Sequence, residues 1–182
     1  FSVFGIGFSF FTKFYYEEYI KHWKNTFYYE LFTNLFILSM FFVIISNESI
    51  SFLIFWEIMS ITSFLLVVHE FKKKWNLEGG ALYIIIAHIG MFFILLSFLP
   101  FIQQTWSTLF SNFHNANLSL WVLNFVLFSA LIWFGSKAGL FPIHIWLPKA
   151  HPIAPSNISS LMSWFMVKLP VLMMLKFLLI FT

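Results

Sequence analysis

The sequence contains no cysteine, no aspartate and no arginine among its 182 residues. Without cysteine the chain forms no disulfide and binds no thiolate-ligated iron–sulfur cluster or zinc ion. Charged residues make up 9% of the chain, whereas a soluble domain carries roughly 25%. Hydrophobic residues make up 60%, more than a soluble domain of this length could bury. The composition therefore predicts an integral membrane protein.

Motifs that mark many soluble enzymes are also missing. The chain has no GxGxxG, P-loop or HExxH motif, and nothing in it indicates a redox cofactor. His144 and His151 stand seven residues apart with Pro148 between them, a poor spacing for metal ligands. The run Lys72–Lys74 has no interleaved aromatic residues, which favours a membrane-flanking role over nucleic-acid binding. We expect no cofactor, no metal and no nucleic-acid partner.

Apolar stretches follow one another along the whole chain. They cover residues 1–12, 31–46, 50–69, 80–102, 119–147 and 158–181. A membrane span needs about 20 residues, so the first stretch is expected to be a truncated span and the second to begin within Phe27–Glu30. Backbone groups in lipid must bond internally, so the spans are helices. We predict an all-α polytopic bundle of about six spans, one transmembrane domain over 1–182, and a segment of a longer protein rather than a signal peptide.

Lysines gather in alternate loops. The segments 13–26, 70–78 and 148–157 contain lysine, whereas 47–49 and 103–118 contain none. Two spans separate each lysine-containing segment from the next, so all three lie on one side of the membrane. By the positive-inside rule this side is cytoplasmic.

One stretch, 119–147, is too long for a single regular span. It contains Gly135, Gly139 and Pro142, and proline interrupts helical hydrogen bonding. A helix broken between Gly135 and Pro142, with Lys137 at the break, is one interpretation, because broken helices occur where they line a cavity. The other is an ordinary proline kink, with the Lys137 side chain reaching to the membrane interface.

Three ionisable residues lie near the middle of apolar stretches: Glu57, Lys137 and Lys168. A charge at that depth costs a few kcal/mol, so proton or ion movement is the first hypothesis. A Glu–Lys pair can exist as a charged pair or separate while one partner changes protonation. The alternative is a static ion pair that ties two helices together. Pro170, two residues after Lys168, is expected to loosen the last helix near that lysine.

Histidines are the next candidates, because their usual pKa lies nearest neutrality. His88 is central in its stretch and could extend a proton relay, or bond a backbone carbonyl as a neutral side chain. His144 and His151 flank Pro148 near the end of the broken stretch. They could take up protons or serve as interfacial capping groups.

Two segments carry a family resemblance. FGSKAGLFPIHIWLPKAHPIAPSNISSLMSWFMVK (134–168) and WEIMS (56–60) resemble the antiporter-like membrane subunits of respiratory complex I, membrane-bound hydrogenases and Mrp cation/proton antiporters. In detail, KAGLFPIHIWLPKAHPIAPS followed by ISSLMS is most similar to the large membrane subunit of formate hydrogenlyase and hydrogenase-4 complexes. The resemblance implies about fourteen helices in two inverted five-helix repeats. This chain would correspond to helix three, in part, through helix eight, with the seventh helix broken.

The resemblance also implies an order of events. Glu57 would modulate the protonation of Lys137, which would pass protons through Lys168 toward the central axis. The second repeat lies outside this chain, so half of the pathway would be present. The implied function is proton or cation translocation, without a redox centre, in a membrane-bound hydrogenase or formate hydrogenlyase-type complex of a bacterial inner membrane. Its partners would be other membrane subunits, the peripheral hydrogenase or dehydrogenase arm, and lipid. The alternatives are the homologous NADH:quinone oxidoreductase subunit, a stand-alone cation/proton antiporter and a non-conducting structural subunit.

Overall fold

The computed structural model describes residues 27–68 and 74–181. Within these residues there is no β-strand, and the all-α prediction is confirmed. Five helical segments in the described part are long and apolar enough to cross a membrane. They are Phe27–Ile45, Ser49–Val67, Leu77–Thr105, Leu120–Ala150 and Ser156–Ile180. They match five of the expected stretches, and the remaining one, 1–12, lies outside the described residues.

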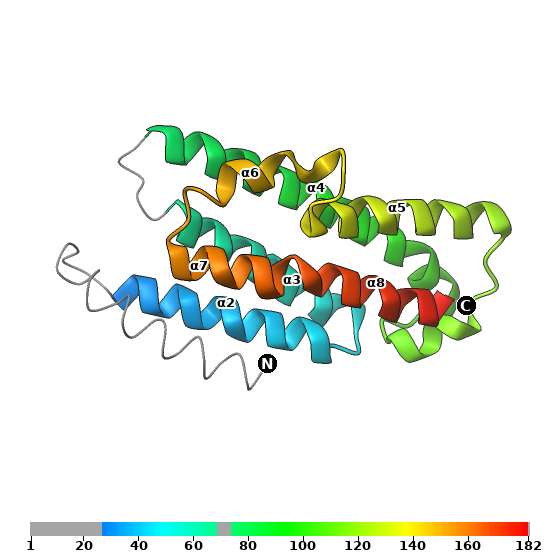
Figure 1. Cartoon of the computed structure of the whole chain (residues 1–182). Helices are drawn as coiled ribbons and strands as arrows, with labels where there is room; N and C mark the ends of the chain where they lie inside the picture. The colour runs from blue at the N-terminus through cyan, green and yellow to red at the C-terminus, as the bar shows by residue number, and fades with distance from the viewer. Residues whose placement is uncertain (1–26, 69–73, 182) are drawn as a thin grey trace.

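The helices follow the chain in a simple order. The long ones are α2 (Phe27–Ile45), α3 (Ser49–Val67), α4 (Lys74–Thr105) and α5 (Leu120–Ala138), with the 3₁₀ turn η1 (Phe110–Asn115) between α4 and α5. After α5 come η2 (Ile143–Trp146), α6 (Leu147–Ala150), α7 (Ser156–Leu161), the π turn η3 (Met162–Met166) and α8 (Lys168–Phe181). Helices α7, η3 and α8 run on as one rod across the front of the bundle (Figure 1).

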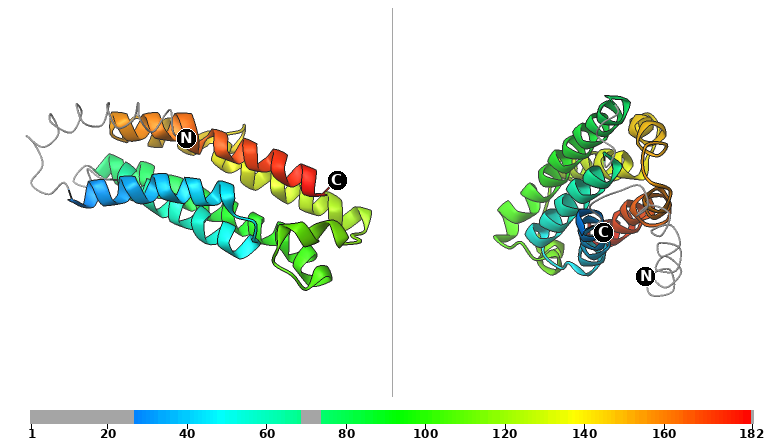
Figure 2. Two further views of the ribbon diagram at one scale, coloured as in Figure 1. Left: turned by 90° about the horizontal axis from the view of Figure 1, so that it is seen from below. Right: turned by 90° about the vertical axis from the view of Figure 1, so that its left-hand side faces the viewer.

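The spans alternate in direction and form an elongated bundle (Figures 1 and 2). The starts of α2, α4 and α7 lie at one end with the end of α3 (Figure 1). The segments 46–49 and 106–119 lie together at the opposite end (Figure 1). We call these the lysine end and the loop end. The described parts of the lysine-containing segments, 74–78 and 148–157, therefore share one end, as the alternation predicts.

Hydrogen bonds join the connections at the loop end. The Ser49 N–H donates to the Thr108 carbonyl at 2.8 Å, and the Phe110 N–H donates to the Asn47 carbonyl at 3.1 Å. The Glu48 carboxylate accepts hydrogen bonds from the hydroxyls of Thr108 and Ser51, which lower the pKa of Glu48. These bonds anchor the start of α3 to the segment that follows α4.

Aromatic side chains fill the bundle toward the loop end. We define the aromatic cluster as Phe52, Trp56, Phe98, Phe110, Trp133, Phe134 and Phe177, each at most 1% exposed. Edge-to-face contacts hold it together, with ring centroids 5.4 Å apart for Trp56–Trp133 and 5.5 Å for Phe52–Phe177. The cluster joins α3, α4, η1, α5 and α8, so it ties every described span except α2 into one core.

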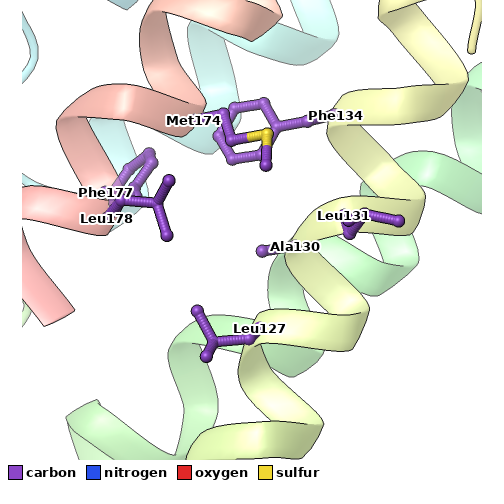
Figure 3. Close-up of a pocket in the computed structure, with 7 residues that line it drawn as sticks. All are labelled: Leu127, Ala130, Leu131, Phe134, Met174, Phe177 and Leu178. Atoms are coloured by element: carbon purple, nitrogen blue, oxygen red, sulfur yellow. The ribbon is translucent and has the colours of Figure 1, made fainter.

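A pocket beside this cluster lies between α5 and α8 (Figure 3). Its lining is apolar: Leu127, Ala130 and Leu131 come from α5, and Met174 and Leu178 from α8. Two cluster members, Phe134 and Phe177, form the rest of its wall. No ionisable side chain lines the pocket, so it is not a site for charge.

The predicted helix break is confirmed. Helix α5 ends at Ala138, and Gly139 takes a left-handed conformation with φ of 72°, which glycine adopts without a steric penalty. The Gly135 carbonyl accepts the N–H groups of both Gly139 and Leu140. These bonds close the end of α5 before the chain turns into η2.

Candidate functional site

Lys137 lies inside the bundle, in the last turn of α5. The residue is 2% exposed, so its side chain does not reach the interface and the snorkelling alternative is wrong. Its Nζ donates to the Tyr83 hydroxyl at 2.7 Å and lies 4.6 Å from the centre of the Tyr83 ring. Within the described residues this is the only hydrogen bond that Nζ makes. A buried ammonium has three protons to donate, so this one is incompletely paired.

The Tyr83 hydroxyl, on α4, contacts side chains from three other segments: Lys137 of α5, Ser63 of α3 and Met166 of η3. Its oxygen lies 2.6 Å from Ser63 Oγ on α3 and 3.5 Å from the sulfur of Met166 in η3. Ser63 in turn donates to backbone carbonyls of its own helix, at 2.7 Å for Met59. We call Lys137, Tyr83, Ser63 and Met166 the lysine node. Its four members come from α5, α4, α3 and η3, so tertiary packing alone brings them together.

The backbone around Lys137 is also held in place. The indole N–H of Trp146 donates to the Ser136 carbonyl at 2.6 Å, which satisfies a carbonyl at the end of α5. The Trp146 ring lies 4.8 Å from the Tyr83 ring. Trp146 therefore supports both partners of the Lys137–Tyr83 hydrogen bond from the far side of the helix break.

Glu57 pairs with His88 instead of with a lysine. Its Oε1 lies 2.8 Å from His88 Nε2, and the other ring nitrogen, Nδ1, lies 2.8 Å from the Ile84 carbonyl. A carbonyl only accepts, so Nδ1 carries a hydrogen. The Glu57–His88 contact then needs one further proton, on the imidazole or on the carboxyl group. The pair is thus a place where one proton is held between two side chains.

Of the two states considered for a Glu–Lys pair, the structure shows the separated one, and the static ion pair between helices is not formed. No ion pair within 4.0 Å joins Glu57 to Lys137 or to Lys168, all three of which the structure describes. The second carboxylate oxygen of Glu57 is buried and has no hydrogen-bond partner among the described residues. Two separate polar pairs therefore stand in the bundle: Glu57–His88 between α3 and α4, and Lys137–Tyr83 between α5 and α4.

Lys168 does not pair with Glu57 or with Lys137. It begins α8 directly after the π turn, it is exposed, and its Nζ lies 4.2 Å from the centre of the Trp164 ring. The loosened helix expected around Lys168 corresponds to this π turn, in which the Val167 N–H bonds the Met162 carbonyl five residues back. Such turns are frequent at functional sites.

His144 and His151 lie near the helix break, on the lysine-end side. The Nδ1 atom of His144 is buried without a partner among the described residues. The Nδ1 atom of His151 lies 2.6 Å from Ser159 Oγ, and its Nε2 lies 3.4 Å from Ser163 Oγ. Partial burial lowers the pKa of His151. Among the described residues, neither histidine forms a hydrogen bond with the lysine node.

Sequence reasoning missed Tyr83, Ser63 and Lys176. The hydroxyl of a buried tyrosine usually needs a hydrogen-bond partner, so Tyr83 near the start of the apolar stretch 80–102 was the available signal. Ser63 had no distinguishing pattern among the many serines of α3. Lys176 belongs to the loop end, where its Nζ donates to the Ser46 carbonyl at 2.8 Å just after α2. A cation near a helix carboxyl terminus is stabilising, so Lys176 is a structural tie.

Comparison with protein families identifies the chain. Residues 46–182 match the family described as "NADH:quinone oxidoreductase/Mrp antiporter, TM". The chain belongs to this family. The match begins before α3 and covers every element of both polar pairs. The chain is thus an antiporter-like membrane subunit, or a part of one.

Individual relatives agree with this assignment. The chain is 39% identical over 145 residues to hydrogenase-4 component B of Escherichia coli (strain K12), a match that covers 80% of this chain and 21% of the relative. It is 34% identical over 146 residues to NADH-ubiquinone oxidoreductase chain 5 of Ascaris suum, covering 79% of this chain and 24% of the relative. The chain therefore spans about a fifth to a quarter of these relatives' length.

A solved structure shows the same fold. It is that of the membrane-bound sulfane sulfur reductase, described as an archaeal respiratory membrane complex. One of its chains superposes with a TM-score of 0.73 at 23% identity, over 85% of this chain and 32% of that one. At this identity the likeness establishes the helical arrangement alone.

Proposed function

We propose that this chain translocates protons as the antiporter-like membrane subunit of a membrane-bound hydrogenase or formate hydrogenlyase-type complex. The observation that carries the proposal is Lys137, buried within a membrane span with a single hydroxyl as its polar partner. A static structural lysine would be expected to have a carboxylate or several carbonyls around it. A group that changes protonation needs a site that tolerates both forms, and one neutral hydroxyl does so.

Glu57 and His88 supply a second group that holds a proton. Their pair lies on α3 and α4, the same two helices that carry Ser63 and Tyr83. A change in the net charge of the pair acts on Lys137 through the low-dielectric interior, because charges there are weakly screened. In this proposal Glu57 and His88 adjust the charge of Lys137 from a distance, without direct contact.

Lys168 is the proposed next carrier. It stands at the junction of the π turn and α8, and it faces outward from the described residues. A proton leaving Lys137 would reach it past Met166, which contacts Tyr83 and precedes Lys168 by two positions. His144 and His151, near the lysine end, are the proposed groups for proton uptake, with the lysine end facing the cytoplasm of a bacterial inner membrane.

Membership of a hydrogenase-type complex rests on the similarity to hydrogenase-4 component B. In such a complex the partners are other membrane subunits and a peripheral hydrogenase arm, and the chain itself holds no redox centre. The similarity to a NADH-ubiquinone oxidoreductase chain supports the homologous subunit of that enzyme as the second candidate.

The test compares two lysines changed in the same way. Lys137→Met and Lys176→Met each remove one ammonium from a membrane span of the full-length subunit in its complex. Proton translocation into inverted membrane vesicles is followed with a pH-sensitive dye, and electron transfer is measured in parallel. We expect Lys137→Met to lower translocation at least about tenfold and Lys176→Met to leave it near wild type, because Lys176 bonds only backbone carbonyls.

Equal translocation in the wild type and in Lys137→Met, with electron transfer intact, would rule out the relay and favour a structural subunit. Sodium-dependent transport without any electron donor would instead identify a stand-alone antiporter. The identity of the electron acceptor in the purified complex, a proton or a quinone, separates the two candidate complexes.

A further inference from the structure

The hydroxyl groups of the lysine node have two hydrogen-bonding arrangements, one for each protonation state of Lys137. With Lys137 charged, Nζ donates to Tyr83, the Tyr83 hydroxyl donates to Ser63 Oγ or to the Met166 sulfur, and Ser63 donates to the Met59 carbonyl. With Lys137 neutral, its nitrogen becomes an acceptor. The Tyr83 hydroxyl can then turn to donate to Nζ, while Ser63 turns to donate to Tyr83.

Changing from one arrangement to the other moves only hydroxyl hydrogens. The contact between Tyr83 and Ser63 at 2.6 Å serves in either direction, since each hydroxyl donates and accepts. No heavy atom needs to shift, and both hydroxyls keep their one proton in each state. The single proton that differs between the states is the one that Lys137 gains or loses.

We propose that Tyr83 is a positioning residue of the proton pathway: with Ser63 it forms a reversible hydrogen-bond switch that stabilises both protonation states of Lys137. The proposal rests on the proposed function, because it assumes that Lys137 changes protonation. It goes beyond that function by assigning a role to two neutral side chains that carry no charge of their own.

Because Tyr83 and Ser63 are buried, the two protonation states of Lys137 depend on these hydroxyls for hydrogen bonds. Tyr83 is 1% exposed and Ser63 is 0% exposed, so bulk water does not replace either partner. Among the residues whose side chains the structure describes, the other ionisable groups on the surrounding elements are Glu57 of α3, Glu78 and His88 of α4, His144 of η2, and Lys168 and Lys176 of α8. None of them bonds Lys137 Nζ, which leaves the Tyr83 hydroxyl as its polar contact in the described residues.

The experiment removes single hydroxyls from the full-length subunit in its complex. Tyr83→Phe keeps the ring against Trp146 and Lys137 but deletes the switch. The matched control is Tyr29→Phe, which removes another buried tyrosine hydroxyl that bonds Asn157 at 2.7 Å, away from Lys137. Ser63→Ala removes the second hydroxyl, and Ser63→Thr keeps it.

We expect Tyr83→Phe to lower proton translocation at least about tenfold, since one charged hydrogen bond is lost. Ser63→Ala should have a smaller effect, Ser63→Thr should restore most of the rate, and Tyr29→Phe should stay near wild type. The pH dependence of translocation is the second measurement. Its midpoint should move by about one unit in Tyr83→Phe, because the lost hydrogen bond is stronger to the charged form of Lys137 than to the neutral form.

The possible results distinguish a failure of the hydrogen-bond switch from a failure of the proposed function on which it rests. If Lys137→Met abolishes translocation while Tyr83→Phe keeps both the wild-type rate and the wild-type pH midpoint, the switch is wrong and the relay stands. A lower rate with an unchanged midpoint and a lower melting temperature would make Tyr83 a packing residue only, which also overturns the inference. If Lys137→Met itself translocates normally, the proposed function fails first.

Discussion

The two ends of the bundle use buried aromatic residues in opposite ways. Toward the loop end, the aromatic cluster packs ring on ring, and the lysine nearest to it, Lys176, is tied to backbone carbonyls. Toward the lysine end, the aromatic ring of Tyr83 presents a hydroxyl to Lys137, and polar atoms remain incompletely paired. The first arrangement stabilises the packing of the bundle, and in the proposed function the second lets Lys137 change protonation.

The two parts of the described bundle also differ in their ionisable groups. No member of the aromatic cluster is ionisable, and the nearest residue of the Glu57–His88 pair, Glu57, directly follows the cluster member Trp56 in α3. Lys137 follows Trp133 and Phe134 in α5, and the histidines near the helix break come after Lys137 in the chain. The aromatic cluster therefore accounts for packing, and the ionisable groups account for the proposed proton movement.

The largest effect should follow from removing a ring from the aromatic cluster. Trp133→Ala leaves a cavity among Phe52, Trp56 and Phe134, and we expect the free energy of unfolding to fall by about 3–5 kcal/mol. Trp121→Ala on the same helix is the control, because Trp121 is 86% exposed and should cost within about 0.5 kcal/mol. Thermal unfolding of the detergent-solubilised complex measures both. Equal losses in the two variants would mean that the cluster is not the stabilising core.

A smaller effect should follow from breaking the pair between Glu57 and His88. His88→Leu leaves the partly buried carboxylate unpaired, at a cost of about 1–3 kcal/mol in the free energy of unfolding. Combining it with Glu57→Gln removes the uncompensated charge, so the double variant should be less destabilised than the sum of the single ones.

The exposed loop residue His114 provides the control for this cycle, and His114→Leu should leave stability and translocation near wild type. Each single change in the pair should lower translocation about tenfold if the pair adjusts the charge of Lys137. Strictly additive losses in stability would show that the Glu57–His88 contact carries no coupling.

The smallest effect concerns acid sensitivity at the lysine end. Burial lowers the pKa of His151 in the folded protein, so between its folded value and the unfolded value of 6.5 the unfolded chain binds more protons. Stability should therefore fall as the pH drops through that window and stay level above it. His151→Gln should reduce the loss of melting temperature between about pH 7.5 and about pH 5.

The loop end offers an internal reference for that measurement. The pKa of Glu48 is lowered from 4.5 by hydrogen bonds from Thr108 and Ser51, so its contribution to stability is present above that value and is lost only as the pH falls further. A loss of stability that begins below pH 4.5 and is unchanged in His151→Gln would assign the acid sensitivity to carboxylates instead.

Much of the fold follows from the composition and spacing of the chain. Residues with few charges in stretches of about 20 can only be membrane helices, because lipid leaves backbone groups no other partners. The glycines and proline around Lys137 predicted the break in α5 for a local reason, since they limit what the backbone can do at those positions. Alternating lysine placement predicted which connections share an end.

The partners of the buried charges did not follow from the sequence. Three ionisable residues suggested a Glu–Lys pair, but side-chain contacts between helices depend on how each helix is rotated about its axis. In the structure Glu57 faces His88 of α4, and Lys137 faces Tyr83 of the same helix. Lys168 remains apart on the outer face.

The sequence by itself determined that the chain is a membrane bundle with a charge at a broken helix, because hydrophobicity, glycine and proline act locally along the chain. Only the tertiary structure decided that the neutral side chain of Tyr83 bonds Lys137, and that Ser63 in turn bonds Tyr83. Such contacts require four segments, distant in the chain, to pack with their polar faces toward one point.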